Sequence, residues 1–259
     1  MADMALVTGA SAGLGAHFAL ALAAQGHDVI LTARRSDRLE ALAAKIRDTF
    51  GTAAHVIPAD LAQPDAVAGL MADIAALGLA VNLLINNAGF GARGDVASLD
   101  GAMQAEMVDV NCRALVELCH AVLPGMIQMR RGAILNVAST AAFQPGPWMA
   151  VYYASKAFVL SFSEALHEEV RRQGVHVTAL CPGPTRTEFF EAAAMEDVFF
   201  RRFAAAPEPV VRDGLAALGI NRAVKVSGLF NALLAAATRI TPRWVTRRAA
   251  GAVQRARGR

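Results

Sequence analysis

Short runs of apolar residues alternate along this chain with longer segments in which apolar positions recur at helical spacing. Alternation of this kind predicts repeated βαβ units and a parallel sheet. Because no Pro-, Gly- or Ser-rich linker and no repeat interrupts it, we expect one domain over residues 1–226 and a helical, Arg-rich tail over 227–259. Strands are predicted at 5–7, 28–32, 55–57, 81–85, 133–137, 175–180 and 223–226, and the intervening helices include one capped by Ser36 or Asp37, one opening near Pro64 and one from Tyr152 to Gln173.

Charge is distributed unevenly along the chain. The 259 residues carry a formal net charge of +3, but no Asp or Glu follows Asp213, whereas seven Arg lie between Arg239 and Arg259. Without those seven Arg, 18 basic residues stand against 22 acidic ones. The basic character therefore belongs to the tail, and we expect no nucleic-acid partner.

Cysteine usage and the absence of targeting signals bear on the location of the protein. Cys112, Cys119 and Cys181 form neither a CxxC pair nor an even disulfide framework, which favours a reducing, cytoplasmic compartment. We expect no secretory signal, and no membrane span because no uninterrupted apolar run reaches about 18 residues. The six His show no metal-ligand spacing, so no metal site is expected.

A glycine-rich turn, Thr8-Gly9-Ala10-Ser11-Ala12-Gly13-Leu14-Gly15, separates the first predicted strand from its helix. Glycines in such a turn allow the backbone to approach a pyrophosphate closely, and the N-terminus of the helix stabilises the phosphate charge. The turn therefore predicts a dinucleotide site. On this motif alone, a Gly-rich turn without a ligand remains the alternative.

Further motifs follow in a fixed order along the chain, and together they resemble the short-chain dehydrogenase/reductase family. They are Asn86-Asn87-Ala88-Gly89, Asn111, Ser139, the Tyr152…Lys156 pair and Pro182-Gly183, which with the glycine turn span residues 8 to about 187. The resemblance implies a single-domain α/β fold, a doubly wound parallel sheet (Rossmann fold) with helices on both faces. It also places ligands at the carboxyl ends of the strands.

The resemblance further implies a set of residues that contact a nicotinamide dinucleotide. The turn contributes Gly9, Ser11, Gly13, Leu14 and Gly15. The adenine is contacted by Asp60 and Leu61, and the cofactor is lined by Asn87, Ala88 and Gly89. The ribose side is contacted by Tyr152 and Lys156, and the nicotinamide end is held by Pro182, Gly183, Thr185 and Thr187.

The end of the second predicted strand indicates which dinucleotide is bound. An acidic residue there binds the ribose hydroxyls of NAD, whereas Arg accommodates the 2′-phosphate of NADP. This chain has Arg34 and Arg35, and no acid before Asp37. We predict NADP(H), with Arg34 as the phosphate ligand and Arg35 as its substitute, while Ser11 matches a position that touches the same phosphate in NADP-dependent relatives. The alternative, a solvated Arg pair, is disfavoured because cations suit the start of a helix poorly.

Four residues form the predicted catalytic set: Asn111, Ser139, Tyr152 and Lys156. Lys156 follows Tyr152 by one helical turn, so its ammonium is expected to lower the pKa of the tyrosine that protonates the alkoxide left by hydride transfer. Ser139 is expected to stabilise charge on the substrate oxygen. By the resemblance, Asn111 holds a water that links Lys156 to solvent. Tyr153 is the other tyrosine, and the family spacing of four selects Tyr152.

We therefore predict an NADP(H)-dependent oxidoreductase that acts on a carbonyl or secondary alcohol. Aromatic residues in the expected substrate lid, about 184–213, together with Phe143 and Trp148, favour an apolar substrate, but the same rings suit packing of the lid or a subunit interface equally well. One alternative is a cofactor-sensing binding protein that acts through its basic tail. Another is an epimerase or dehydratase relative, for which the chain leaves little room.

The segment from Leu229 to Trp244 departs from the C-terminal pattern of many family members. It carries an apolar stripe beside Arg residues. Such a stripe suits a weak contact with an acidic membrane surface. It also suits packing on its own domain or on a second subunit, and we favour packing over membrane contact. We expect a homodimer or homotetramer.

Overall fold

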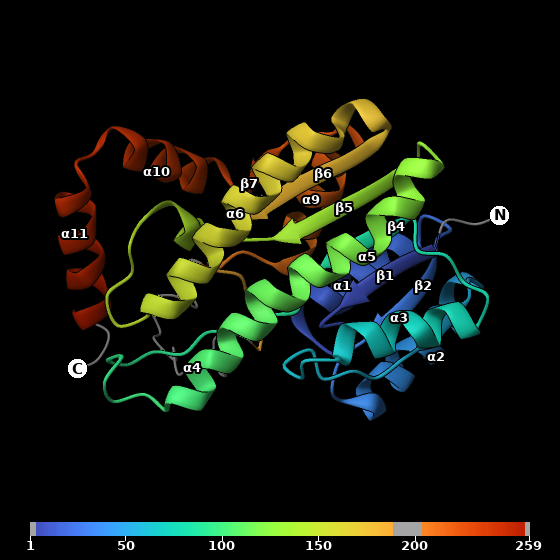
Figure 1. Ribbon diagram of the computed structural model, residues 1–259. Coiled ribbons are helices and arrows are strands. Elements are labelled where there is room, and N and C mark those ends of the chain that lie inside the picture. The colour runs from blue at the N-terminus through green and yellow to red at the C-terminus, as the bar shows by residue number, and fades with distance from the viewer. Residues whose placement is uncertain (1–3, 189–203, 257–259) are drawn as a thin grey trace.

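A seven-stranded parallel sheet forms the centre of the molecule (Figure 1). The computed structural model describes residues 4–188 and 204–256. The strands stand in the order β3-β2-β1-β4-β5-β6-β7, so the direction of winding reverses between β1 and β4. The strands are β1 (Met4–Thr8), β2 (Asp28–Thr32), β3 (Ala54–Val56), β4 (Leu83–Asn86), β5 (Gly132–Val137), β6 (Val175–Cys181) and β7 (Val224–Val226).

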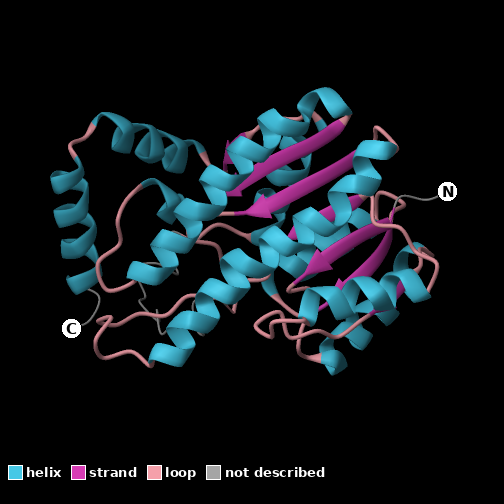
Figure 2. Cartoon of the chain, viewed as in Figure 1, coloured by secondary structure: helices cyan, strands magenta, loops and turns pink. Residues whose placement is uncertain are grey.

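Helices cover both faces of the sheet, which confirms the predicted doubly wound α/β fold (Figure 2). One face packs against α1, α2 and α9, and the other against α3, α5 and α6. The helices are α1 (Gly13–Ala23), α2 (Ser36–Phe50), α3 (Ala66–Ala76), α4 (Gly101–Val108), α5 (Ala114–Gln128), α6 (Ala150–Val170), α9 (Pro207–Gly219), α10 (Leu229–Ile240) and α11 (Arg243–Ala256).

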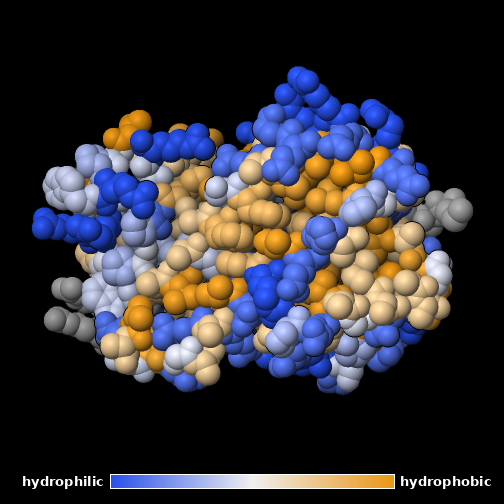
Figure 3. Space-filling model, in the orientation of Figure 1, coloured by the Kyte–Doolittle hydropathy of each residue, from blue (hydrophilic) through white to orange (hydrophobic). Residues whose placement is uncertain are grey.

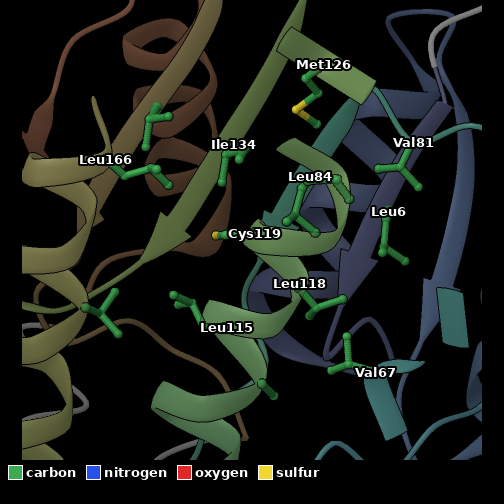
Figure 4. Close-up of a cluster of buried hydrophobic side chains, with 14 of the residues drawn as sticks. Leu6, Val67, Val81, Leu84, Leu115, Leu118, Cys119, Met126, Ile134 and Leu166 are labelled. Atoms are coloured by element: carbon green, nitrogen blue, oxygen red, sulfur yellow. The ribbon is translucent and has the colours of Figure 1, made fainter. Parts of the chain in front are cut away.

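Two hydrophobic cores result, one on each side of the sheet. Successive residues of β1 point to opposite faces, so Leu6 belongs to one core and Val7 to the other, and both are fully buried. This is why the inner strands of a parallel sheet read as continuous apolar runs. Figure 4 shows the core under α5, where Leu118 and Met126 meet Leu6 and Leu84. Each such side chain contributes about 2 kcal/mol by leaving water.

One helix cap differs from the sequence prediction. Arg35, not Ser36 or Asp37, holds the capping position of α2, and no side chain caps this helix. Asp37 lies in its first turn instead, where a negative charge suits the helix dipole. α3 begins at Ala66, two residues after Pro64, as predicted, and the carbonyl groups of the preceding turn accept from Arg113.

The helical segment Gly101–Gln128 is interrupted by a π-helical turn. α4 ends at Val108, Asp109–Arg113 form the π-helical turn and α5 continues from Ala114. Such turns insert one extra residue and are frequent at functional sites. Here the turn contains Asn111, a member of the predicted catalytic set.

The helical segment Gly101–Gln128 is the one helix among the described residues that is long and apolar enough to cross a membrane, with a hydropathy of 1.2. The core helix of a globular protein meets the same criterion. Leu118, Cys119 and Met126 of this segment are buried against the sheet, so it serves as a core helix here.

Candidate active site

The winding of the sheet reverses between β1 and β4, and open α/β sheets bind ligands at the carboxyl ends of the strands at such a position. Thr8 and Asn87 tie the two strand ends together. The Thr8 Oγ1 donates to the Ile85 carbonyl and accepts from the backbone N–H groups of Asn87 and Ala88, at 2.9 Å each. The Asn87 Nδ2 in turn donates to the Thr8 carbonyl at 2.9 Å. The glycine turn and the Asn87-Ala88-Gly89 segment are therefore held side by side.

The glycine turn has the shape that a phosphate cradle requires. Gly9 and Gly13 adopt φ values of +64° and +54°, which glycine tolerates without steric cost. A Cβ on Gly15 would lie 2.2 Å from the Gly9 carbonyl oxygen. α1 begins here without a capping side chain or an acid in its first turn, so its N–H groups suit an anion. Leu14 packs its side chain on the core, which leaves its backbone for the predicted contact.

Arg35, rather than Arg34, lies beside Ser11. The Arg35 Nε and Nη2 donate to the Ser11 Oγ at 3.3 and 3.2 Å. Arg34 instead pairs with Glu106 at 3.4 Å. The residue that the sequence ranked second thus has the more favourable position for a 2′-phosphate.

Two further residues complete this cationic pocket, and sequence reasoning missed both. Arg38 lies one turn into α2, and the Glu188 carboxylate bridges it to Arg35, with distances of 2.5 and 3.0 Å. The two guanidinium groups hold the pKa of Glu188 below its ordinary value, Arg38 having the larger effect. The spacing of Arg35 and Arg38 on one helical face is the signal that would have found Arg38.

The predicted adenine side is organised by Arg113, another residue missed at the sequence level. Asp60 caps its own loop by accepting from the Ala62 N–H at 3.2 Å, while Leu61 is buried. Arg113 Nη2 donates to the Ala62 and Gln63 carbonyls at 2.9 and 3.1 Å. Because Arg113 closes the π-helical turn, it connects the loop after β3 to the segment that carries Asn111.

The structure brings the predicted catalytic residues together. Tyr152 and Lys156 come from α6 and Ser139 follows β5. The ammonium of Lys156 lies 5.9 Å from the centre of the Tyr152 ring, and the side chains of Ser139 and Tyr152 share a hydrogen bond. Gly89 borders this cluster, since a Cβ there would lie 2.8 Å from the Asn111 Oδ1 and 3.5 Å from the Lys156 Nζ.

Asn111 uses its side chain to hold neighbouring elements in place. Its Nδ2 donates to the Phe90 carbonyl and to the Ser155 Oγ, both at 3.0 Å, and its Oδ1 accepts from the Phe90 N–H at 3.0 Å. The amide is thus engaged with protein groups on both sides. Its predicted role in holding a water stays a prediction.

The pKa values of the pair differ from the sequence prediction. Burial raises the pKa of Tyr152 to about 12, outweighing the hydrogen bond with Ser139. Burial also lowers the pKa of Lys156 to about 8. The predicted lowering of the Tyr152 pKa is therefore wrong for this structure. The reason is burial, which removes both groups from water and disfavours the charged form of each. The Lys156 Nζ donates to the Val137 carbonyl at 2.8 Å.

The segment after β6 lies over the glycine turn. The Thr140 N–H donates to the Pro182 carbonyl at 2.9 Å, which joins the ends of β5 and β6. A Cβ on Gly13 would lie 3.1 Å from the Thr187 Cβ, while Thr185 Oγ1 donates to the Gly183 carbonyl at 3.0 Å. The predicted nicotinamide residues therefore lie at the carboxyl ends of the strands.

The C-terminal helix α11 also reaches this site, which the sequence did not indicate. Gln254 is buried, and its Nε2 donates to the Tyr153 hydroxyl at 3.2 Å. Arg93, from the loop after β4, donates to the Gln254 carbonyl. Gly251 borders Pro147 and Trp148. Tyr153 stands edge-on to Tyr152, with 6.1 Å between the ring centres, so α11 forms a wall next to Tyr152, the predicted proton donor.

The aromatic residues predicted near the substrate divide into two groups. Phe143 packs against the core and Trp148 borders α11, so both have packing roles. The lid aromatics from Phe189 to Phe203 lie outside the described residues. Among the described residues, no group of three His, Cys, Asp or Glu could hold a metal ion.

Comparisons with known proteins identify the family. The short chain dehydrogenase family model matches residues 3–197. The chain is 30% identical over 252 residues to the human very-long-chain 3-oxoacyl-CoA reductase. That alignment covers 95% of this chain and 77% of the human protein, while the match to the bovine enzyme of the same name covers 59% of its length. The chain belongs to the short-chain dehydrogenase/reductase family and is an oxidoreductase.

Solved structures agree with this assignment. A short-chain dehydrogenase from Sphingobium yanoikuyae, determined in complex with NADPH, is 34% identical, with a TM-score of 0.82 and coverage of 92% of this chain and 94% of that one. A 7β-hydroxysteroid dehydrogenase is 26% identical, with a TM-score of 0.88 and coverage of 96% of each chain. The likeness thus extends through most of the chain, beyond the nucleotide-binding half.

Proposed function

We propose that this NADP(H)-dependent oxidoreductase reduces a bulky, apolar ketone to a secondary alcohol. The observation that carries the proposal is the convergence of Ser139, Tyr152 and Lys156 beside Gly89, at the carboxyl edge of the sheet. The glycine turn fits the pyrophosphate of the cofactor, and Arg35 with Ser11 fits its 2′-phosphate. When bound, NADPH supplies the hydride.

The residues of this chain perform the remaining chemistry. Ser139 donates a hydrogen bond to the substrate oxygen and stabilises the negative charge that develops there. Tyr152 donates its proton to that oxygen. Because its pKa is about 12, the Tyr152 phenol is protonated throughout the neutral range. The proton required for reduction of the ketone is therefore present on Tyr152 before the reaction. Lys156 holds the ribose side of the cofactor, with its ammonium 5.9 Å from the centre of the Tyr152 ring.

The substrate class is supported by the substrates for which two relatives are named and by the wall beside the site. The human relative is named for a long-chain 3-oxoacyl substrate and one structural neighbour for a hydroxysteroid. In this chain Tyr153 stands edge-on to Tyr152, and Tyr153 and Met149 both contact Gln254 of α11. Tyr153 and Met149 are side chains that suit an apolar molecule.

The test follows NADPH oxidation by absorbance with long-chain 3-oxoacyl thioesters, steroid ketones and small polar ketones, using wild type and Tyr152→Phe. Turnover of the bulky ketones that disappears in Tyr152→Phe, while NADPH binding persists, is the expected result. Turnover retained in Tyr152→Phe overturns the catalytic assignment. NADPH binding without turnover of any carbonyl supports the cofactor-sensing alternative.

The protein is further proposed to be a cytoplasmic homodimer or homotetramer. Support comes from its three free cysteines, of which Cys119 and Cys181 are buried, and from the frequency of symmetric assemblies among soluble enzymes. Light scattering coupled to size-exclusion chromatography measures the mass, and a monomeric mass contradicts the assembly.

A further inference from the structure

The amphipathic helix α10 turns its large apolar side chains away from the body of the protein. Its inner side, which faces the body of the protein, carries small or polar residues, among them Asn231 and the buried Ala235. Its outer side carries the large apolar ones, whereas a helix on a globular surface normally buries its large apolar side chains. We call this outer set, together with the first aromatic residue of α11, the apolar ridge: Leu229, Phe230, Leu233, Leu234, Ile240 and Trp244.

The ridge is exposed to a degree that packing on the same chain does not explain. The exposed fractions of its six side chains lie between 53% and 87%. Single exposed apolar residues are ordinary, but a contiguous set marks a surface that binds something apolar. The view in Figure 3 shows hydrophobic and strongly hydrophilic residues side by side over α10.

Cations surround the ridge. Arg239, Arg243, Arg247 and Arg248 are exposed, and no acid follows Asp213 in the sequence. The Arg248 guanidinium lies 5.5 Å from the centre of the Trp244 ring, so an interfacial aromatic and a cation share one side of α11.

A hollow of about 470 Å³ lies directly beside the ridge, between β7 and α10. It is lined by three cations, Arg222, Lys225 and Arg239, and by Leu229 of the ridge itself. Its single acid, Asp213, is engaged by Lys225 at 3.6 Å and by the Ser227 hydroxyl at 2.8 Å. Two of the three cations therefore remain without an acidic partner among the described lining residues.

We propose that the apolar ridge and this hollow bind the surface of an anionic phospholipid bilayer. The ridge side chains enter the acyl boundary, and Arg222, Arg239 and the Arg residues of α11 contact the phosphate headgroups. A second copy of the chain is the less suitable occupant. A two-fold interface would place the same cationic face against itself, with no acid after Asp213 to offset the repulsion.

The experiment sediments the full-length protein with vesicles of pure phosphatidylcholine and with vesicles in which about a third of the lipid is phosphatidylglycerol. We expect binding to the anionic vesicles that weakens as salt is raised. The double variant Phe230→Ser/Leu233→Ser is expected to bind roughly tenfold more weakly. Arg239→Gln/Arg243→Gln is expected to lose the preference for anionic lipid. Leu77→Ser, which removes an exposed apolar residue at the end of α3, is the matched control and is expected to bind as wild type.

Three outcomes overturn the proposal: no binding of wild type to anionic vesicles, equal binding by the ridge variant, or a ridge variant whose only change is a lower molecular mass, which identifies a subunit interface. Thermal unfolding and NADPH binding of each variant distinguish a folding defect from the loss of the lipid-binding surface. If Phe230→Ser/Leu233→Ser fails to fold, Arg239→Gln/Arg243→Gln still tests the proposal, because it leaves the apolar ridge intact. The proposal does not depend on the ketone reduction, because lipid binding and turnover are measured separately.

Discussion

The amide of Gln254 donates a hydrogen bond to the hydroxyl of Tyr153, 101 positions earlier in the sequence and directly adjacent to Tyr152. Gln254 also contacts the Met149 sulfur at 3.6 Å. The C-terminal helix is therefore part of the wall of the active site, although it follows the last strand of the sheet. Substitutions in the tail should alter how substrate is held.

Replacing Gln254 with Leu tests this relationship. We expect the KM for bulky ketones to rise by roughly threefold to tenfold because the wall loses its fixed position. NADPH affinity should not change, and stability should fall by about 1 kcal/mol from the lost hydrogen bonds. Steady-state kinetics and thermal unfolding measure these effects, with Val253→Ala, on the exposed side of the same helix, as the control. An unchanged KM in Gln254→Leu contradicts the proposed role of α11.

The second prediction separates the two arginines at the end of β2. Arg35→Ala should weaken NADPH binding by roughly 10- to 100-fold, the effect of losing a charge-assisted contact with a phosphate. NADH binding should change little, because NADH lacks that phosphate. Arg34→Ala is the matched control, since Arg34 pairs with Glu106 instead of approaching Ser11. A larger loss in Arg34→Ala would restore the ranking made from the sequence.

The third prediction concerns Glu188, whose carboxylate occupies the pocket between Arg35 and Arg38. A 2′-phosphate has to displace this carboxylate, so Glu188→Gln should tighten NADPH binding by about twofold to fivefold, the range of a solvent-exposed ion pair. NADH binding should stay the same. Glu106→Gln, which frees Arg34, is the control. Fluorescence titration decides between the arginines, since tightening by Glu106→Gln alone identifies Arg34 as the phosphate ligand.

The fourth prediction follows from the buried ammonium of Lys156. Its pKa of about 8 lies below the ordinary value of 10.5, so the folded state binds fewer protons than the unfolded state between these values. Stability contributed by this group therefore rises with pH from about 8 to 10.5 and is lowest below 8. Lys156→Met should abolish turnover yet raise the free energy of unfolding at pH 7 by roughly 1 to 3 kcal/mol, after the lost bond to Val137 is counted.

Denaturant unfolding of wild type and Lys156→Met over pH 7 to 10 tests this sign. The stability advantage of the variant should shrink as the pH rises through 8, because the wild-type lysine then becomes neutral. An advantage that grows with pH would show that the ammonium is stabilised in the fold. Lys45→Met, at an exposed lysine of α2, is the control for the loss of a lysine as such.

Most of the fold could be predicted from the sequence, because alternating short apolar runs and helical periods depend on local spacing. The existence and order of the strands follow from that spacing. The exact helix starts do not: α2 begins after Arg35 without a capping side chain, and the turn before α3 has its carbonyl groups bonded to the distant Arg113. The π-helical turn at Asn111 likewise leaves no mark in the apolar pattern.

The sequence by itself determined the chemistry: which residue types were present, in which order, and that Tyr152 and Lys156 share one face of a helix. Tertiary structure alone decided their environment. Burial raises the pKa of Tyr152 and lowers that of Lys156, whereas the spacing of the two residues predicted a lower pKa for Tyr152. The directions of two neighbouring side chains place Arg35 rather than Arg34 at Ser11. The fold also brings Gln254 of the C-terminal helix into contact with Tyr153. These outcomes depend on long-range contacts and desolvation, neither of which is encoded in the separation of residues along the chain.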